Sequence, residues 1–126
     1  MTATQDTPDP SGTTVDALHL NGRTFDLQSS SASVVATGHA TRFHYFEEGG
    51  VLWGDYAGDT VKLGRFAGKR VGSRIELAFV HSTTSDAVVF GSATSEISRE
   101  RDGKLKLTEF FKGPDGTDQT SICLEA

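Results

Sequence analysis

Apolar and polar residues alternate along most of the chain after residue 17, with the period of two that is typical of half-buried β-strands. Short segments rich in Gly, Asp and Pro separate the alternating runs, and Arg101-Asp102-Gly103 is a strong hairpin signal. No segment shows helical periodicity. The pattern predicts eight strands, at residues 23–28, 41–48, 51–57, 60–67, 73–82, 87–98, 104–112 and 118–125, and residues 68–70 are expected to connect two of them.

Evenly spaced strands with short connections predict an all-β fold, an antiparallel up-and-down barrel of about eight strands, with a two-sheet sandwich as the alternative. Eight strands enclose room for packed side chains or for one small ligand. Residues 18–126 are expected to form this single domain. Residues 1–17 carry few apolar side chains, so a disordered N-terminal tail is expected there. The segment 29–40 is either a lid over one mouth of the barrel or an extension of the two strands it joins.

The alternation also predicts which side chains face the interior. Residues 75, 77 and 79 are apolar and share a parity with His81, and residues 105, 107 and 111 share one with Glu109. A buried carboxylate must be paired, protonated or placed in a wet cavity. Glu109 and His81 are therefore candidates for proton transfer in a cavity. The alternatives are that Glu109 bonds an inward polar side chain and that either residue lies at the rim.

The segment 51–56 places the only tryptophan of the chain, Trp53, beside Asp55 and Tyr56. Aromatic side chains with a polar tip suit a ligand pocket, although a single tryptophan also suits a core. Parity is ambiguous here, because either Trp53 and Asp55 or Leu52 and Tyr56 face inward. Arg65 is either an interior counter-ion for Glu109 or a residue that emerges into water. The predicted ligand-binding residues are Trp53, Asp55, Tyr56, Tyr45, Arg65, Phe79 and Phe111.

Composition excludes several classes of partner. The chain has 126 residues and a formal net charge of −5, and its longest basic run is Lys69-Arg70. Binders of nucleic acid or anionic membrane normally carry a concentrated positive patch, so neither partner is expected. Cys123 is the only cysteine and is predicted to be a buried packing residue. The first residues do not have the basic and apolar regions of a signal peptide, so a cytoplasmic location is expected.

Motifs for metals and cofactors are not found. The histidines at positions 19, 39, 44 and 81 are scattered, and only His39 and His44 could approach each other across a loop. No glycine-rich phosphate loop precedes a helix, and no Gly-x-Ser-x-Gly nucleophile motif occurs. No metal and no cofactor is therefore predicted.

Short motifs spread over the chain carry a family resemblance: Phe43-x-Tyr45, Glu48-Gly49, Tyr56-x-Gly58, Gly64, His81, Gly91, Ser95, Asp102-Gly103-Lys104, Leu107-x-Glu109-x-Phe111, Ser121 and Glu125. Over roughly residues 20–126 the chain resembles short bacterial proteins that commonly carry the label N-acetylglutamate synthase. The resemblance implies a small calycin-like barrel, of the lipocalin or avidin type. His81 and Glu109 match positions of the family pattern, and Phe111 stands where other members tend to carry Trp. Acetyltransferase activity is not expected, because the usual fold for acetyl-CoA needs a helix N-terminus that this sequence does not predict.

Three functions remain open on the sequence. The first is a barrel that binds a small, largely apolar molecule. The second is a cyclase or isomerase of natural-product biosynthesis, in which Glu109 or His81 moves a proton on a substrate held in the cavity. The third is a structural module with a filled core that forms a homodimer through apolar residues on its outer face, namely Phe66, Val80 and Phe110.

Overall fold

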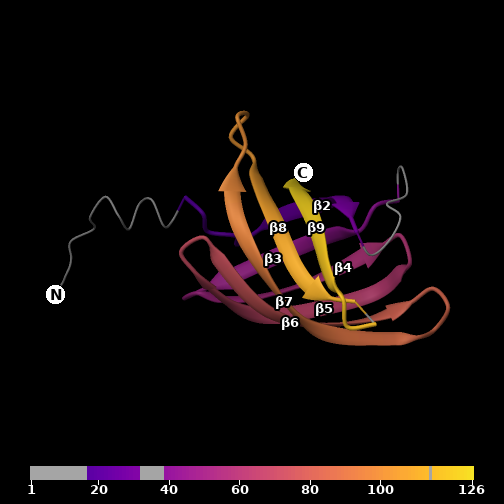
Figure 1. The fold of residues 1–126 in the computed structure, drawn as a ribbon. Helices are drawn as coiled ribbons and strands as arrows, with labels where there is room; N and C mark the ends of the chain where they lie inside the picture. The colour runs from indigo at the N-terminus through magenta and orange to yellow at the C-terminus, as the bar shows by residue number, and fades with distance from the viewer. Residues whose placement is uncertain (1–16, 32–38, 114) are drawn as a thin grey trace.

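The structure, a computed structural model, describes residues 17–31, 39–113 and 115–126. Within them, each strand pairs antiparallel with the next one along the chain, and the last pairs with the first (Figure 1). The strands are β2 (Arg23–Ser30), β3 (Arg42–Glu48), β4 (Val51–Gly58), β5 (Val61–Val71), β6 (Arg74–Thr83), β7 (Val88–Arg99), β8 (Leu105–Lys112) and β9 (Asp118–Glu125). The predicted all-β, eight-stranded up-and-down barrel is confirmed, and the sandwich is excluded.

Two strands extend by two or more residues beyond the end that the sequence pattern predicts. Residues 68–70, expected to be a connection, belong to β5, whose pairing with β6 continues to Val71 and Arg74. The turn instead lies at Gly72, where a φ of 60° favours glycine. In β2, Ser29 and Ser30 pair with β9, so the start of the segment 29–40 is strand. The predicted lid at residues 32–38 and the tail at residues 1–16 lie outside the described residues.

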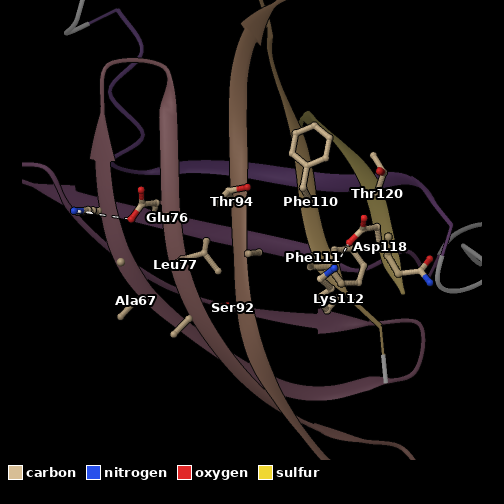
Figure 2. Close-up of a pocket in the computed structure, with 15 residues that line it drawn as sticks. Ala67, Glu76, Leu77, Ser92, Thr94, Phe110, Phe111, Lys112, Asp118 and Thr120 are labelled. Atoms are coloured by element: carbon tan, nitrogen blue, oxygen red, sulfur yellow. Dashed lines mark hydrogen bonds and ion pairs between the residues drawn. The ribbon is translucent and has the colours of Figure 1, made fainter. Parts of the chain in front are cut away.

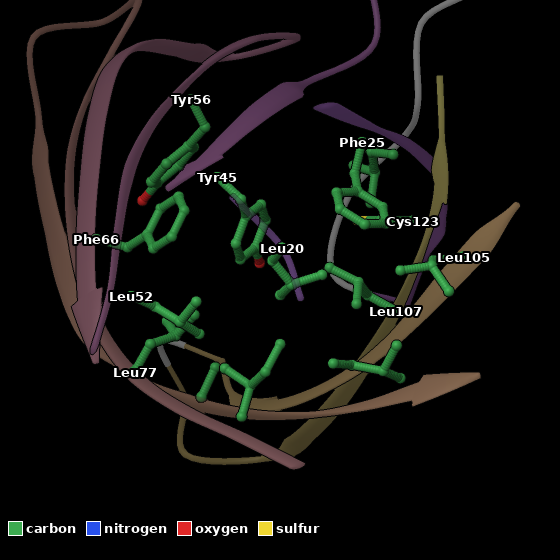
Figure 3. Packing of buried hydrophobic residues seen from close by; sticks show 14 residues of the cluster. Leu20, Phe25, Tyr45, Leu52, Tyr56, Phe66, Leu77, Leu105, Leu107 and Cys123 are labelled. Atoms are coloured by element: carbon green, nitrogen blue, oxygen red, sulfur yellow. The ribbon is translucent and has the colours of Figure 1, made fainter. Parts of the chain in front are cut away.

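One half of the barrel interior is filled with hydrocarbon. Looking into the ring of strands, the labelled apolar side chains point inward and Leu20 lies near the centre (Figure 3). The residues that are less than 2% exposed in this half are Leu20, Phe25, Leu52, Ile75, Leu105, Leu107 and Cys123. Cys123 is thus buried, as predicted. Because Leu20 comes from the segment that precedes β2, this segment covers the filled end.

A buried ion pair between Glu47 on β3 and Arg70 on β5 holds this covering segment in place. Two hydrogen bonds of 2.8 Å join the guanidinium to both carboxylate oxygens, and the backbone N–H of Leu20 donates to Oε1 of Glu47 at 3.0 Å. Burial raises the pKa of Glu47, but the hydrogen bonds from Arg70 and Leu20 outweigh burial, so the net pKa lies below its usual value. The carboxylate is therefore ionised at neutral pH and fully paired at the filled end.

Candidate functional site

The other half of the barrel is lined by inward-facing side chains that keep part of their surface exposed. They are Phe43 on β3, Phe79 and His81 on β6, and Glu109 and Phe111 on β8, all half-buried. Phe43, Phe79 and Phe111 pack against the buried core without being enclosed by it. The interior is therefore filled at one end and accessible to water at the other, which we call the open half.

Glu109 is the acid of the open half. It shares its side of β8 with Leu105 and Leu107, so the predicted inward orientation is confirmed. The hydroxyl of Ser95, itself fully buried, donates to Oε2 of Glu109 at 3.5 Å, which is the long limit of a hydrogen bond. Burial raises the pKa of Glu109 to about 7, and the hydrogen bond from Ser95 offsets this only in part. Near neutral pH the carboxyl group therefore exists in both protonation states.

The negative charge of Glu109 affects the pKa values of three other titratable groups in the interior. Burial raises the pKa values of Tyr45, Tyr56 and Cys123, and the charge of Glu109 raises each of them further. The two phenols and the thiol are therefore neutral at physiological pH. When ionised, Glu109 is the one negative charge among these four groups.

Tyr56 and His81 form a hydrogen-bonded pair nearer the mouth. The Tyr56 hydroxyl lies 2.8 Å from Nδ1 of His81, and the two rings meet edge to face with centroids 5.5 Å apart. Phe43 stacks on Tyr56 at 5.0 Å, and Phe79 stacks on His81 at 6.3 Å. Burial lowers the pKa of His81, so the imidazole is neutral at physiological pH. The pair offers polar groups in an aromatic surrounding, but no charge.

Two glycines set the positions of these rings. A Cβ atom at Gly64 on β5 would lie 2.5 Å from Cζ of Tyr56, and one at Gly91 on β7 would lie 3.0 Å from Cζ of Phe79. Each ring therefore lies directly against the backbone of a neighbouring strand, where a side chain larger than hydrogen would displace it. The glycines let large rings line the wall of a narrow barrel.

Six of the predicted site residues share the interior. Tyr56, Phe79, His81, Glu109 and Phe111 face the open half, and Tyr45 lies between the two halves. Tyr45 is 1% exposed and packs against Phe25 at 5.4 Å and Phe66 at 4.6 Å between ring centroids.

Trp53, Asp55 and Arg65 do not line the interior. On β4 the residues that face inward are Leu52 and Tyr56. Trp53 is instead 42% exposed and stacks on Phe46 at the outer surface. Of the two alternatives left open by the sequence, the one with Leu52 and Tyr56 inward holds, and the predicted ligand-binding residues Trp53 and Asp55 lie outside the interior.

Arg65 is not the interior counter-ion of Glu109. A register shift between Val61 and Leu63 lets Val61 pack against the core while Leu63 and Arg65 face outward, so the parity inferred from Val61 does not extend along β5. The same strand turns Phe66 inward, where it is 5% exposed. Phe66 was expected on the outer face, and this expectation is also wrong.

The outer face of β5–β9 carries a shallow groove (Figure 2). Its floor is the backbone of residues whose side chains point inward, such as Leu77, and its sides are outward side chains such as Ala67 and Phe110. The charged residues that line it are paired with one another: Lys69 lies 3.9 Å from Glu76, and Lys112 contacts Asp118. Because its charged side chains are already paired, the groove offers fewer free polar groups to a ligand than the open half does. The open half is therefore the candidate site.

The structure adds two findings on metals and membranes. In residues 17–31, 39–113 and 115–126, no group of three or more His, Cys, Asp and Glu side chains is placed to hold a metal ion. His44 instead lies 3.2 Å from the hydroxyl of Thr24, and the carbonyl of His39 accepts a hydrogen bond from the N–H of Asp59. Across the same described ranges, no helix has the length and apolar character needed to cross a membrane.

A closed eight-stranded up-and-down barrel, packed at one end and open with aromatic and polar lining at the other, defines a small barrel of the calycin class. Barrels of eight strands are in general wide enough for packed side chains or for one small ligand. Residues 18–126 match the family model described as avidin-like protein, and the chain belongs to this family. Neither the curated proteins nor the solved structures contain a match to the chain. The avidin-like part of the resemblance seen in the sequence is confirmed.

Proposed function

We propose that the protein binds a small molecule with a largely apolar body in the open half of its barrel. The observation that carries this proposal is that Phe43, Phe79 and Phe111 face inward yet stay half-buried. Aromatic side chains that pack without being covered leave apolar surface for a ligand to bury, which is the main driving force for such binding. Membership of the avidin-like family supports a ligand inside the barrel.

Polar groups at two depths would orient the ligand. The Tyr56–His81 pair lies beside the aromatic rings, and deeper in the barrel Ser95 and Glu109 provide a hydroxyl and a carboxyl group. A pocket of mostly apolar contacts with a few directional hydrogen bonds is the usual composition of a small-molecule site. The proposed ligand therefore has an apolar ring or chain and at least one group able to form a hydrogen bond.

Titration with N-phenyl-1-naphthylamine, a neutral dye that fluoresces in apolar surroundings, tests this proposal. The matched variants are Phe111→Ala, which removes a ring from the open half, and Phe110→Ala, which removes its outward neighbour on β8. We expect saturable binding to the native chain, a Kd about tenfold higher for Phe111→Ala because a buried aromatic contact is lost, and an unchanged Kd for Phe110→Ala. An absence of saturable binding, or equal effects of both substitutions, would contradict the proposal.

A second candidate function is acid–base catalysis in the same cavity, favoured by the pKa of about 7 for Glu109. A general base is most effective when its pKa lies near the working pH. The probe reaction is ring opening of 5-nitrobenzisoxazole: the carboxylate removes the proton on C3, the electron pair of the C3–H bond forms the third bond of a nitrile, and the N–O bond breaks with its electron pair leaving on the phenolate oxygen. We expect a rate that rises with pH through about 7 and is lost in Glu109→Gln, whereas equal rates for the two proteins would remove Glu109 as a base.

A further inference from the structure

Among residues 17–31, 39–113 and 115–126, no Lys, Arg or His side chain forms an ion pair with Glu109. Its carboxylate accepts the 3.5 Å hydrogen bond from Ser95, and a single long bond from a neutral hydroxyl compensates a buried carboxylate poorly. The strands beside β8 place Ser95 on β7 and Ser121 on β9 opposite Glu109 in the ladders. Both are neutral, and Ser121 bonds Ser30 at 3.0 Å.

The charged and titratable groups on the other strands do not balance the carboxylate either. Tyr45 on β3, Tyr56 on β4 and Cys123 on β9 face the interior and are neutral at physiological pH, because burial raises the pKa of each. His81 on β6 is neutral as well.

The remaining inward charges of the described strands form two ion pairs at the filled end, Glu47 with Arg70 and Arg23 with Glu125, the latter at 2.7 Å between Nη1 and Oε2. Arg70 uses two of its nitrogens on Glu47 and a third on the carbonyl of Gly72, at 2.7 Å. This guanidinium is therefore committed to the filled end. The other lysines and arginines of the described strands face solvent or pair at the surface.

From this arrangement we infer that the ligand of the open half is an organic cation, a protonated amine attached to an apolar ring, whose ammonium group pairs with the carboxylate of Glu109. The inference rests on the proposed function and assigns the chemical class of its ligand. An ammonium would supply the charge and the hydrogen-bond donors that the barrel itself does not offer to this carboxylate. The rings of Phe43, Phe79 and Phe111 would cover the apolar body.

Three compounds with the same indole ring and different side chains test the inference by calorimetry: tryptamine (cation), indole-3-ethanol (neutral) and indole-3-acetate (anion). At about pH 8, where Glu109 is ionised, the native chain should bind tryptamine at least about tenfold more tightly than indole-3-ethanol, and indole-3-acetate least tightly. Towards about pH 5 the preference for tryptamine should disappear, because Glu109 becomes protonated below its pKa of about 7.

Glu109→Gln should bind tryptamine and indole-3-ethanol about equally, since the amide retains the shape of the side chain without its charge. The matched control is Glu96→Gln, which removes the same charge from the outer face of β7, where the Glu96 side chain is 49% exposed and pairs with Arg74. The control should keep the preference of the native chain.

Equal binding of tryptamine and indole-3-ethanol by the native chain, or a preference that survives Glu109→Gln, would overturn the inference. If N-phenyl-1-naphthylamine binds but tryptamine does not, the amine assignment fails while the proposed function stands. If none of the four compounds binds, the proposed function fails and the inference fails with it.

Discussion

Replacing Glu109 by glutamine should make the protein more stable at neutral and alkaline pH, and not at acidic pH. Burial raises the pKa of Glu109 from its ordinary value of 4.5 to about 7. The folded chain therefore holds this proton more tightly than the unfolded chain does. The contribution of Glu109 to stability is fully present below about pH 4.5 and is lost as the pH rises through about 7.

This difference in pKa corresponds to about 3 kcal/mol of folding free energy. That figure is an upper limit, because Glu109 is only half-buried and a partly exposed charge is screened by solvent. We expect Glu109→Gln to be about 1–3 kcal/mol more stable than the native chain above about pH 8, with the gain shrinking to near zero at about pH 4.5.

Urea unfolding of both proteins across this pH range measures the effect. The difference between the two proteins is the relevant quantity, because other carboxyl groups such as Asp26 and Glu47 have lowered pKa values and change the stability of both proteins in the same way. Glu96→Gln is the exposed control and should show no such pH dependence. A gain that is independent of pH, or a loss of stability at about pH 8, would refute the reasoning.

Three further substitutions probe other parts of the structure. Glu47→Gln should destabilise the protein by about 3–5 kcal/mol at neutral pH, as measured by urea unfolding, because it leaves the Arg70 guanidinium buried beside a neutral amide; a loss below about 1 kcal/mol would mean that this end is solvated. Gly64→Ala should displace the ring of Tyr56, which should lower stability by about 1–3 kcal/mol and weaken dye binding. An NMR signal of the Tyr56 ring that is unchanged on ligand addition, together with an unchanged affinity for the dye, would contradict this. Trp53→Phe should leave ligand affinity unchanged in a dye titration, because Trp53 lies on the outer face, and a changed Kd would place it at the site after all.

The barrel and the inward acid could be predicted from the sequence because both depend on simple alternation. Glu109 follows Leu105 and Leu107 at a spacing of two on a strand without a register shift, so its parity determines its direction. The inward direction of His81 follows in the same way, because His81 shares the parity of Ile75 and Leu77 on β6.

The residues whose direction was predicted wrongly or left open lie on strands where the alternation of apolar and polar residues is ambiguous or is interrupted. On β4, Leu52 and Trp53 are both large and apolar, so neither parity is distinguished by its residues, and only pairing with the flanking strands resolves the choice. On β5, the register shift between Val61 and Leu63 reverses the parity, and a bulge of this kind leaves no clear mark in the sequence.

The buried pair of Glu47 and Arg70 was missed, although each residue carried part of the signal. Glu47 shares the inward parity of Tyr45 on β3, and Arg70 shares that of Phe66 on β5. Because the sequence pattern predicts a connection at residues 68–70 and an outward Phe66, it does not reveal the inward parity of Arg70. The lesson is that an inward acid and an inward base at the same end of a barrel should be sought together.

The most direct test of a ligand held by Glu109 in the open half is a set of NMR distance contacts in the tryptamine complex. Protons of the indole ring should show contacts to Phe79 and Phe111, and the Glu109 carboxyl carbon should shift on binding. Contacts to Phe110 or Trp53 on the outer face instead, with an unchanged Glu109 signal, would contradict the account.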